Sequence, residues 1–545
     1  MMTSKRKSPV VLQTYDYKQM FDAIHLEQAL SDIYDYGLND DNLPLIYQAN
    51  RDVRMAVNTP AGLTERQRLE NVVLQGDTFG SILASVQVDT IGKEVEDSGY
   101  GYMYQDKLPV SLLGLVDDMI GVTEAGYKAQ QLNALLNVKT AEKRLQFGVS
   151  KCKTMLVGKN KESVINNPLT VDKWSVIHVE NIETKDSDLI ETYEGRVEIK
   201  NTDNQKYLGF VLSCKGDNMV NINAMKKKSI WIIRKIFTKL DSLHLKKYYF
   251  ECGMIFLNVM LRSSIFYACE TYYNLKETEI RQLERIEESF LRKLFKTSRG
   301  CPLSQLYLES GHTPARYHVK KTRLLFLQYI LKEEPSSLIY RFLYQQFEKR
   351  TRGDWASSCL DDLKDLKTEM SLEDIKAMSK NKFCSKVKKA IQETAFKYLI
   401  QKRGSKGQEI TYKELKKADY LLPGYFPITI EEQRSIFEIR NRMVYICSNF
   451  SNGMKKEICP CGLVEDMKHI YICKLWSTRN HIRNGNQKPE YEIIFSDNIS
   501  EQIKVNKYFI MNFQERETYE KETKPHAILD NSDPLYSVLE NSNGQ

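Results

Sequence analysis

The chain has 545 residues, of which 42% are hydrophobic and 28% are charged. This composition excludes a disordered polyelectrolyte and a collagen-like chain, and at roughly 150 residues per domain the length excludes a single small module. Lysine and arginine number 79 against 71 acidic residues, so the net charge of +8 does not by itself require a polyanionic partner. The distribution of charge along the chain is therefore more informative than its sum.

Neither a membrane span nor a secretory signal is predicted. The most apolar stretch, Met254 to Leu261, is shorter than the roughly 18 to 20 residues that a transmembrane helix needs, and it contains Asn258. Lys5, Arg6 and Lys7 are not followed by an apolar segment. We therefore expect an intracellular protein without a membrane partner, whose 11 cysteines stay reduced.

The periodicity of apolar residues predicts an α+β fold up to about Leu212 and a mostly helical chain beyond Asn221. Three short apolar runs are typical of strands: Val10 to Leu12, Val110 to Val116 and Met119 to Val122. Farther on, apolar residues recur at helical spacing, and the face predicted to point inward carries Ile230, Ile233, Phe237 and Leu240.

Three carboxylates stand out against this pattern. Asp16 follows the first predicted strand and precedes an amphipathic helix predicted around Leu26 to Tyr34, and the pair Asp117 and Asp118 lies at a predicted hairpin turn between two apolar strands. A lone acidic pair in a turn is commonly structural, because aspartate side chains bond nearby backbone amides. Together with Asp16, however, the pair would form an oxygen site suited to Mg²⁺. Two such ions can activate a hydroxyl and stabilise a leaving pyrophosphate, which is the chemistry of nucleotidyl transfer.

The order of these segments resembles the palm of reverse transcriptases, specifically those of non-LTR (LINE-like) retrotransposons. Residues 15–22 resemble the first acidic motif, which makes Asp16 a metal ligand and places Phe21 where the family discriminates against a ribose 2′-hydroxyl. Gln75 and Gly76 resemble the motif that contacts template and incoming nucleotide, and a glycine permits close backbone approach there. Residues 115–118 resemble the aromatic-x-Asp-Asp motif, with Leu115 in the aromatic position.

Two further segments extend the resemblance. Residues 146–154 resemble the following lysine-bearing motif, in which Lys151 or Lys153 would offer a cation to the departing phosphate, and we assign this catalytic role to Lys153. Tyr207, Leu208 and Gly209 resemble the primer grip. Because Asp16 lies only fifteen residues from Met1, the fingers segment of the family is expected to be missing, as in an N-terminally truncated retroelement product.

Cations accumulate immediately after the primer-grip-like segment. Eight lysines and arginines lie between residues 226 and 247 against one acid, Asp241. This suits a thumb that binds the phosphates of a nucleic acid, for which the candidates are Lys227, Arg234 and Lys235. A merely solvated helix face is the alternative, and Trp231 is expected in the core rather than stacked on bases.

A candidate zinc site lies near the C-terminus. Cys459, Cys461, His469 and Cys473 give the spacing Cys-x-Cys-x7-His-x3-Cys, and three thiolates with one imidazole form a tetrahedral set for Zn²⁺. One residue between the first two cysteines is unusually short, so Cys447 or His481 could replace one of them, and unrelated buried cysteines are the alternative. The resemblance supports zinc, because LINE-like proteins carry a Cys-Cys-His-Cys element downstream of the thumb that is associated with nucleic-acid binding.

The predicted domains are a reverse-transcriptase palm over residues 1–214, a helical thumb over 215–345, a helical connecting region over 346–450, a zinc knuckle over 451–480 and a partly disordered tail over 481–545. The resemblance implies an RNA-directed DNA polymerase in the nucleus with two Mg²⁺ ions, an RNA template, a DNA primer or target DNA, and dNTPs. Two alternatives stay open. One is a catalytically inactive remnant that binds nucleic acid through thumb and zinc knuckle, and the other is a helical scaffold whose acidic hairpin is only a turn.

Overall fold

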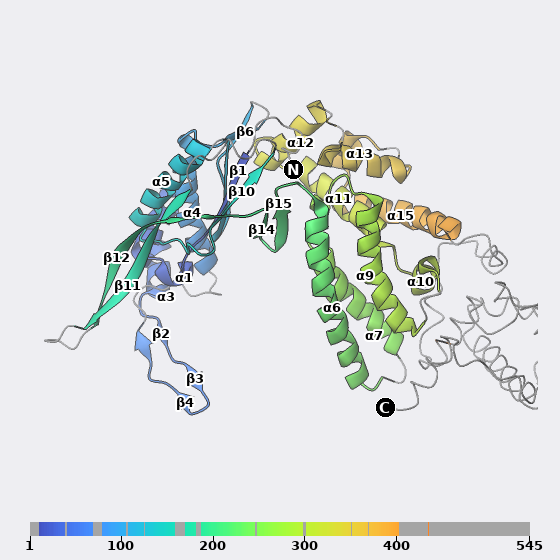
Figure 1. Cartoon of the computed structure of the whole chain (residues 1–545), viewed down its shortest axis with the longest axis horizontal. Coiled ribbons are helices and arrows are strands. Elements are labelled where there is room, and N and C mark those ends of the chain that lie inside the picture. Colours follow the sequence, from blue (N-terminus) through green and yellow to red (C-terminus); the bar gives the residue numbers. More distant parts are fainter. Residues whose placement is uncertain are drawn as a thin grey trace, which may run out of the picture.

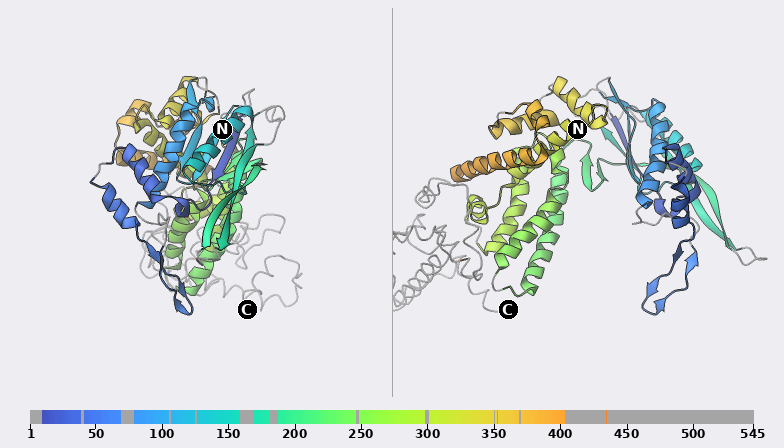
Figure 2. Two further views of the ribbon diagram at one scale, coloured as in Figure 1. Left: turned by 90° about the vertical axis from the view of Figure 1, so that its left-hand side faces the viewer. Right: turned by 180° about the vertical axis from the view of Figure 1, so that it is seen from behind.

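The computed structural model describes residues 10–38, 41–68, 79–104, 107–124, 126–158, 169–180, 187–245, 248–297, 301–349, 351, 353–368, 370–402 and 434. The fold is mixed α+β, as predicted. A sheet lobe (residues 10–201) and a helical lobe (residues 218–402) lie side by side, and they are joined at one end so that the ribbon forms an arch (Figures 1 and 2).

A five-stranded sheet is the centre of the sheet lobe, with the strand order β13-β10-β1-β9-β8. Its strands are β1 (Val10–Asp16), β8 (Leu112–Leu115), β9 (Asp118–Thr123), β10 (Lys153–Val157) and β13 (Lys200–Asn201). The central β1 pairs antiparallel with β9 and β10, and β13 runs parallel to β10. The strands predicted at the beginning of the chain and after the acidic pair are confirmed. The run predicted as one strand from Val110 to Val116 is instead divided between β7 (Leu108–Val110) and β8.

Helices cover one face of this sheet. They are α1 (Met20–Ala23), α2 (Leu26–Asp35), α3 (Leu43–Asn50), α4 (Gly80–Asp97) and α5 (Gly126–Glu142). Apolar residues at helical spacing on α4 and α5, such as Leu83 and Leu132, are fully buried against Val11 and Tyr15 of β1. Burial of this apolar surface is the main force that holds β1 in the middle of the lobe.

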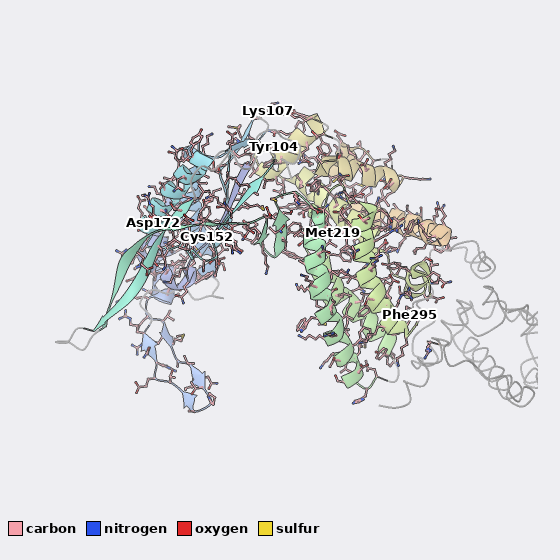
Figure 3. The ribbon with its side chains drawn as sticks, in the orientation of Figure 1. Tyr104, Lys107, Cys152, Asp172, Met219 and Phe295 are labelled. Carbon is pink, nitrogen blue, oxygen red and sulfur yellow. The ribbon has the colours of Figure 1, made fainter. Side chains whose placement is uncertain are left out.

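The opposite face of the sheet is closed by a helix from much later in the chain. The hairpin of β6 (Tyr102–Tyr104) and β7 forms a cluster with Val10 and with Phe342 of α12 (Leu338–Lys349). The rings of Tyr104 and Phe342 have centroids 4.6 Å apart, and Lys107 makes an ion pair with Glu348 at 3.6 Å. Tyr104 and Lys107 lie where the two lobes meet (Figure 3). This contact, the interlobe contact, fastens the lobes together.

Three two-stranded ribbons complete the β structure. The first, which we call the arginine ribbon (residues 51–68), contains β2 (Arg54–Met55), β3 (Asn58–Thr59), β4 (Gly62–Leu63) and β5 (Gln67–Arg68), and it projects from the sheet lobe in all views (Figures 1 and 2). A longer ribbon pairs β11 (Thr170–Glu180) with β12 (Ser187–Glu198). The third pairs β14 (Asn204–Tyr207) with β15 (Phe210–Ser213) and lies between the lobes.

The helical lobe has two apolar cores that share α11. Its helices are α6 (Asn218–Ser242), α7 (Tyr249–Phe256), the π-helix η2 (Leu257–Arg262), α8 (Ser263–Ile265), the 3-10 helix η3 (Cys269–Thr271), α9 (Glu277–Phe295), α10 (Leu303–Ser310), α11 (Ala315–Lys332), α13 (Trp355–Asp365), α14 (Leu372–Ala377) and α15 (Lys380–Lys402). The side chain of Asp217 caps α6 by accepting a hydrogen bond from the N–H of Met219 at 2.8 Å. No described helix is both long and apolar enough to cross a bilayer.

Two details of the predicted organisation differ from the structure. The domain boundary predicted between residues 345 and 346 falls inside α12, whose apolar side runs through that point into the core. Ile233, Phe237 and Leu240 are buried as predicted, but Ile230 is 53% exposed, because Ser229 and Ile232 lie on the buried side of α6 in its place. The zinc knuckle, the tail and the end of the connecting region lie outside the described residues.

Candidate active site

The ends of two neighbouring strands bring Asp16 and Asp118 together. β1 ends at Asp16, β9 begins at Asp118, and the antiparallel register pairs these two residues directly. Directly opposed residues have Cβ atoms about 5 Å apart and point to the same face of a sheet. Two carboxylates from distant parts of the sequence therefore share one face at one end of the central strands.

Asp117 lies in the two-residue turn that joins β8 to β9. Leu115 pairs with Asp118 across this turn, and Val116 has a φ of 56°. A β-branched residue rarely adopts this left-handed backbone, and such strain costs on the order of 1–3 kcal/mol. The side chain of Val116 packs against the core of the sheet lobe, which offsets that strain. The strained turn therefore places Asp117, like Asp118, at the end of the central strands.

Negative charge is concentrated at this end of the sheet, which we call the acidic edge (Asp16, Asp117 and Asp118). The pKa of Asp118 is raised, first by burial and then by the carboxylates of Asp117 and Asp16. Lys151 and Lys206 act in the opposite direction on the same pKa. A further cation at the acidic edge would therefore stabilise the ionised form of Asp118.

Lys151 is the lysine that contacts the acidic edge. Its Nζ lies 2.9 Å from Oδ2 of Asp16, and this ion pair raises the pKa of Lys151. Apart from that ion pair, Oδ2 of Asp16 is buried without a partner among the described residues. Lys153, the residue predicted to take the catalytic role, lies on β10 opposite Thr14. Its role stays a prediction, and Lys151 is the better-placed residue.

The loop before Lys151 approaches Asp16 so closely that a glycine fits better than a residue with a side chain. The N–H of Gly148 donates a hydrogen bond to the backbone carbonyl oxygen of Asp16 at 2.7 Å. A Cβ atom at position 148 would lie only 3.1 Å from Oδ2 of Asp16. Next to it, Phe147 stacks on Tyr17 with ring centroids 5.2 Å apart. The lysines of this segment stand out in its sequence, whereas the position of Gly148 directly beside Asp16 depends on the fold and was not predicted.

The hairpin of β14 and β15, which lies between the lobes, contacts the acidic edge. The hydroxyl of Tyr207 donates a long hydrogen bond of 3.4 Å to the backbone carbonyl oxygen of Asp118, and burial together with Asp118 raises the pKa of Tyr207 to about 12. Leu208 and Gly209 form the turn with φ values of 45° and 80°. The hydroxyl of Tyr267, just after α8, donates to the carbonyl oxygen of Leu208 at 2.8 Å. The predicted primer-grip residues thus lie between the acidic edge and the helical lobe.

The predicted nucleotide-contacting residues are only partly described. Phe21 lies on the short helix α1, shortly after Asp16, and is half-buried against the core of the sheet lobe. Gln75 and Gly76 lie outside the described residues. The predicted contacts of these three residues with template and nucleotide stay predictions.

The predicted phosphate-binding cations lie on one exposed side of α6. Lys227, Arg234 and Lys235 are all exposed. Trp231, predicted to be in the core, is instead 63% exposed, and Nζ of Lys235 lies 5.0 Å from the centroid of its ring. The core prediction is wrong because the neighbours Ile232 and Ile233 fill the buried side. The face of α6 therefore combines cations with an aromatic ring, both of which suit a nucleic acid.

The acidic edge offers the type of ligand atom that Mg²⁺ binds. Carboxylate oxygens are the ligands that Mg²⁺ prefers, and a buried Oδ2 atom of Asp16 meets only a lysine. Among the described side chains, no three His, Cys, Asp or Glu residues lie close enough together to hold a metal ion, and Lys151 occupies the side of Asp16 at 2.9 Å. The predicted zinc ligands Cys459, Cys461, His469 and Cys473 lie outside the described residues.

Comparison with known proteins gives weak likenesses. No protein-family model and no curated protein sequence matches the chain. Similar solved structures include apo telomerase from Candida tropicalis (11% identity, TM-score 0.28, 75% of this chain and 50% of that chain) and telomerase from Candida albicans in complex with a fragment of telomeric RNA (12%, 0.23, 62% and 49%). A C. tropicalis telomerase truncated from its C-terminal domain is also similar (12%, 0.24, 39% and 36%).

The chain thus spans between about a third and a half of the length of these telomerase chains. Telomerases are polymerases related to reverse transcriptases, and none of these three structures is a retrotransposon protein. TM-scores of 0.23 to 0.28 are too low to define a shared fold. The acidic edge is therefore the stronger guide to function.

Proposed function

We propose that the chain is a nucleic-acid polymerase of the reverse-transcriptase class, which extends a DNA primer on an RNA template. The observation that carries this proposal is the direct pairing of Asp16 with Asp118, with Asp117 in the adjoining strained turn. Three carboxylates at one point of a sheet, with a raised pKa at Asp118, are costly unless they bind a cation. In this proposal the sheet lobe is the palm and α6 belongs to the thumb.

Asp16, Asp117 and Asp118 would hold two Mg²⁺ ions. When bound, these ions supply the activation of the primer 3′-hydroxyl and the neutralisation of the leaving pyrophosphate. The side chain of Lys151 is 69% exposed and tethered only at Asp16, so on release it is free to turn toward the departing phosphate. Tyr207 and the turn at Leu208 and Gly209 position the primer end by fixing the backbone of Asp118 against the helical lobe.

The template and primer would lie along the exposed side of α6. Lys227, Arg234 and Lys235 offer positive charge to the phosphates, and the exposed ring of Trp231 offers a stacking surface. Leu115, 57% exposed beside the acidic edge, offers a small apolar surface where the family has an aromatic ring.

Primer extension tests this proposal. Purified protein is incubated with poly(rA), an oligo(dT) primer, dTTP and Mg²⁺ or Mn²⁺, and we expect template-dependent extension that is lost in the double variant Asp117→Asn and Asp118→Asn. The matched control neutralises another adjacent, exposed acidic pair, Glu96→Gln and Asp97→Asn on α4, and should keep activity. Extension that survives the first double variant would show that the acidic edge is not the active site. Salt-sensitive RNA binding without extension under either metal would favour the non-catalytic remnant.

A finer assignment, to a LINE-like retroelement protein of the nucleus with a zinc knuckle, rests on the ordered motifs of the sequence. It predicts about one Zn²⁺ per chain bound by Cys459, Cys461, His469 and Cys473. Elemental analysis of the purified protein should find this zinc, and Cys473→Ala should lower it and weaken RNA binding. The control Cys384→Ala changes a half-buried cysteine of α15 and should leave the zinc content unchanged. Zinc content that is absent, or equal in both variants, would refute this ligand set.

A further inference from the structure

The arginine ribbon is a part of the sheet lobe for which the acidic edge gives no role. It is an interrupted hairpin of two short ladders, β2 with β5 and β3 with β4, whose register shifts by one residue between them. The N–H of Thr64 donates to the carbonyl oxygen of Val57 at 3.0 Å, and Gly62 turns with a φ of 117°. Apart from Ala56 and Thr59, every residue from 54 to 68 is exposed. A two-stranded hairpin without a core is marginally stable by itself. A partner that covers this exposed extension would stabilise it.

The charge on the ribbon identifies the chemistry of that partner. Arg54 and Arg68 are directly opposed in the register of β2 and β5, so their side chains lie on one face. Like charges in this position are destabilising, and among the described residues one carboxylate, that of Asp52, compensates them, at 3.8 Å from Arg54 and 3.2 Å from Arg68. With Arg51 and Arg66, the ribbon carries four arginines against two acidic residues. An anionic partner would relieve this repulsion, and the fork of an arginine matches a phosphate.

The shape of the ribbon narrows the partner further. The major groove of B-form DNA admits a two-stranded β-ribbon, whereas the deep and narrow major groove of an A-form duplex does not. Near the tip the ribbon exposes Leu63 (75%) and Val57 (51%), apolar side chains that suit the methyl groups of thymine in that groove. The ribbon lacks an aromatic residue for stacking on unpaired bases.

We infer that the arginine ribbon binds double-stranded DNA by entering its major groove, with Arg54, Arg66 and Arg68 on the phosphates. This inference rests on the proposed function in one respect: it names the double-stranded target DNA that would supply the primer end as a partner of that polymerase. It makes the ribbon a second nucleic-acid surface, separate from the side of α6 that would hold template and primer.

Duplex binding measured without catalysis tests the inference. A fluorescent B-form DNA duplex is titrated with the full chain in EDTA and without dNTPs, over a series of salt concentrations. In the variant Arg54→Gln, Arg66→Gln and Arg68→Gln, the slope of log K against log salt should fall by about two to three, at about 0.9 per lost phosphate contact. The matched control, Lys364→Gln, Lys382→Gln and Lys389→Gln, removes the same charge from exposed positions of α13 and α15 and should leave the slope unchanged.

Two further binding measurements test whether the ribbon selects B-form DNA. An A-form RNA duplex should bind the ribbon variant and the parent chain equally, and Leu63→Ser should weaken DNA binding without changing the salt slope. Equal losses for DNA and RNA duplexes, or equal losses in ribbon variant and control, would overturn the inference. Since no nucleotide or divalent metal is present, ribbon-dependent binding with no primer extension would refute the proposed function alone, and extension with ribbon-independent binding would refute the inference alone.

Discussion

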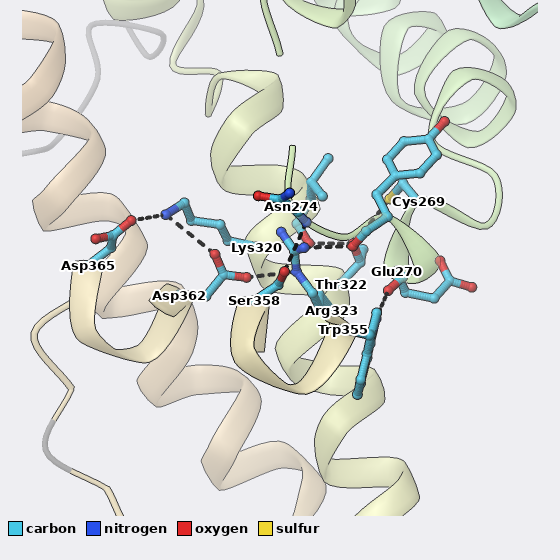
Figure 4. A network of polar contacts seen from close by, with 12 residues as sticks. Cys269, Glu270, Asn274, Lys320, Thr322, Arg323, Trp355, Ser358, Asp362 and Asp365 are labelled. Carbon is cyan, nitrogen blue, oxygen red and sulfur yellow. Dashed lines mark hydrogen bonds and ion pairs between the residues drawn. The ribbon is translucent and has the colours of Figure 1, made fainter. Parts of the chain in front are cut away.

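Two regions of the molecule contain buried or half-buried carboxylates, and they differ in the charges that surround them. In the helical lobe, Asp362 is 4% exposed and meets Nε of Arg323 at 2.8 Å and Nζ of Lys320 at 3.4 Å (Figure 4). At the acidic edge, Asp118 has two other carboxylates as neighbours. Burial raises the pKa of both residues, but each neighbouring charge around Asp362 lowers its pKa, whereas Asp117 and Asp16 raise that of Asp118 further.

This difference distinguishes a carboxylate that stabilises the fold, such as Asp362, from a carboxylate that is available to bind a cation, such as Asp118. The guanidinium of Arg323 has a second partner besides Asp362. It donates a hydrogen bond to the carbonyl oxygen of Tyr272 at 2.6 Å and so holds α11 against the loop after η3. Glu287 is another example, fully buried between Arg262 at 2.7 Å and the hydroxyl of Tyr307 at 2.6 Å. A buried ion pair of this kind fixes which elements pack together. The carboxylates of the acidic edge are not balanced by buried partners in this way, and a bound cation would supply the missing positive charge.

The largest expected effect is a split between activity and stability in Asp118→Asn. Loss of a metal ligand should lower primer extension by more than about 100-fold, since even groups behind the ligands cost 10- to 100-fold. The free energy of unfolding in EDTA should stay equal or rise by up to about 1 kcal/mol, because the substitution removes repulsion with Asp117 and Asp16. Extension assays and denaturant unfolding measure the two quantities. A loss of stability above about 2 kcal/mol would place Asp118 with the structural charges instead.

The reverse split is expected in the helical lobe. Arg323→Met leaves Asp362 buried beside Lys320 alone and should lower the free energy of unfolding by about 3–5 kcal/mol. Activity per folded molecule should not change. Adding Asp362→Leu to this variant removes the unpaired charge and should restore much of the stability. Denaturant unfolding of both variants decides the point, and a single variant as stable as the double variant would show that the pair is not a structural lock.

The smallest expected effect is a pH dependence. The folded-state pKa of Asp118 lies above its ordinary value of 3.8, so between these two values the folded chain holds a proton that the unfolded chain has released. Stability contributed by this group is therefore present at low pH and is lost as pH rises through the window. In EDTA, the difference in unfolding free energy between Asp118→Asn and the parent chain should grow with pH there and then level off. If this difference in unfolding free energy does not change with pH, the carboxylates of the acidic edge do not repel one another.

Local patterns predicted the strands that carry the candidate site. An apolar run ending at Asp16 and another beginning after Asp118 were sufficient for β1 and β9, because strand period and turn residues are local properties. Their direct pairing needed the resemblance to a known family as well, since register across a sheet depends on the whole lobe.

Contacts that depend on how distant segments pack could not be predicted from the sequence. Whether Lys151 or Lys153 reaches Asp16 depends on how the loop at Gly148 passes under β1. The exposed position of Trp231 is decided by which side of α6 finds a core, and its neighbours are equally apolar. Tertiary packing decides each of these cases, and the sequence shows only the candidates.

The interlobe contact has a consequence for how this polypeptide can be divided. Val10, Tyr102 and Leu108 are each under 5% exposed, and Leu338 and Phe342 of α12 pack against their cluster. During synthesis that side stays uncovered until residues 338–349 have emerged, so the sheet lobe completes its folding late and through a contact of long sequence separation. A fragment that stops before α12 will leave this apolar surface in water and will tend to aggregate, whereas one that extends through α12 and its supporting helices will be soluble.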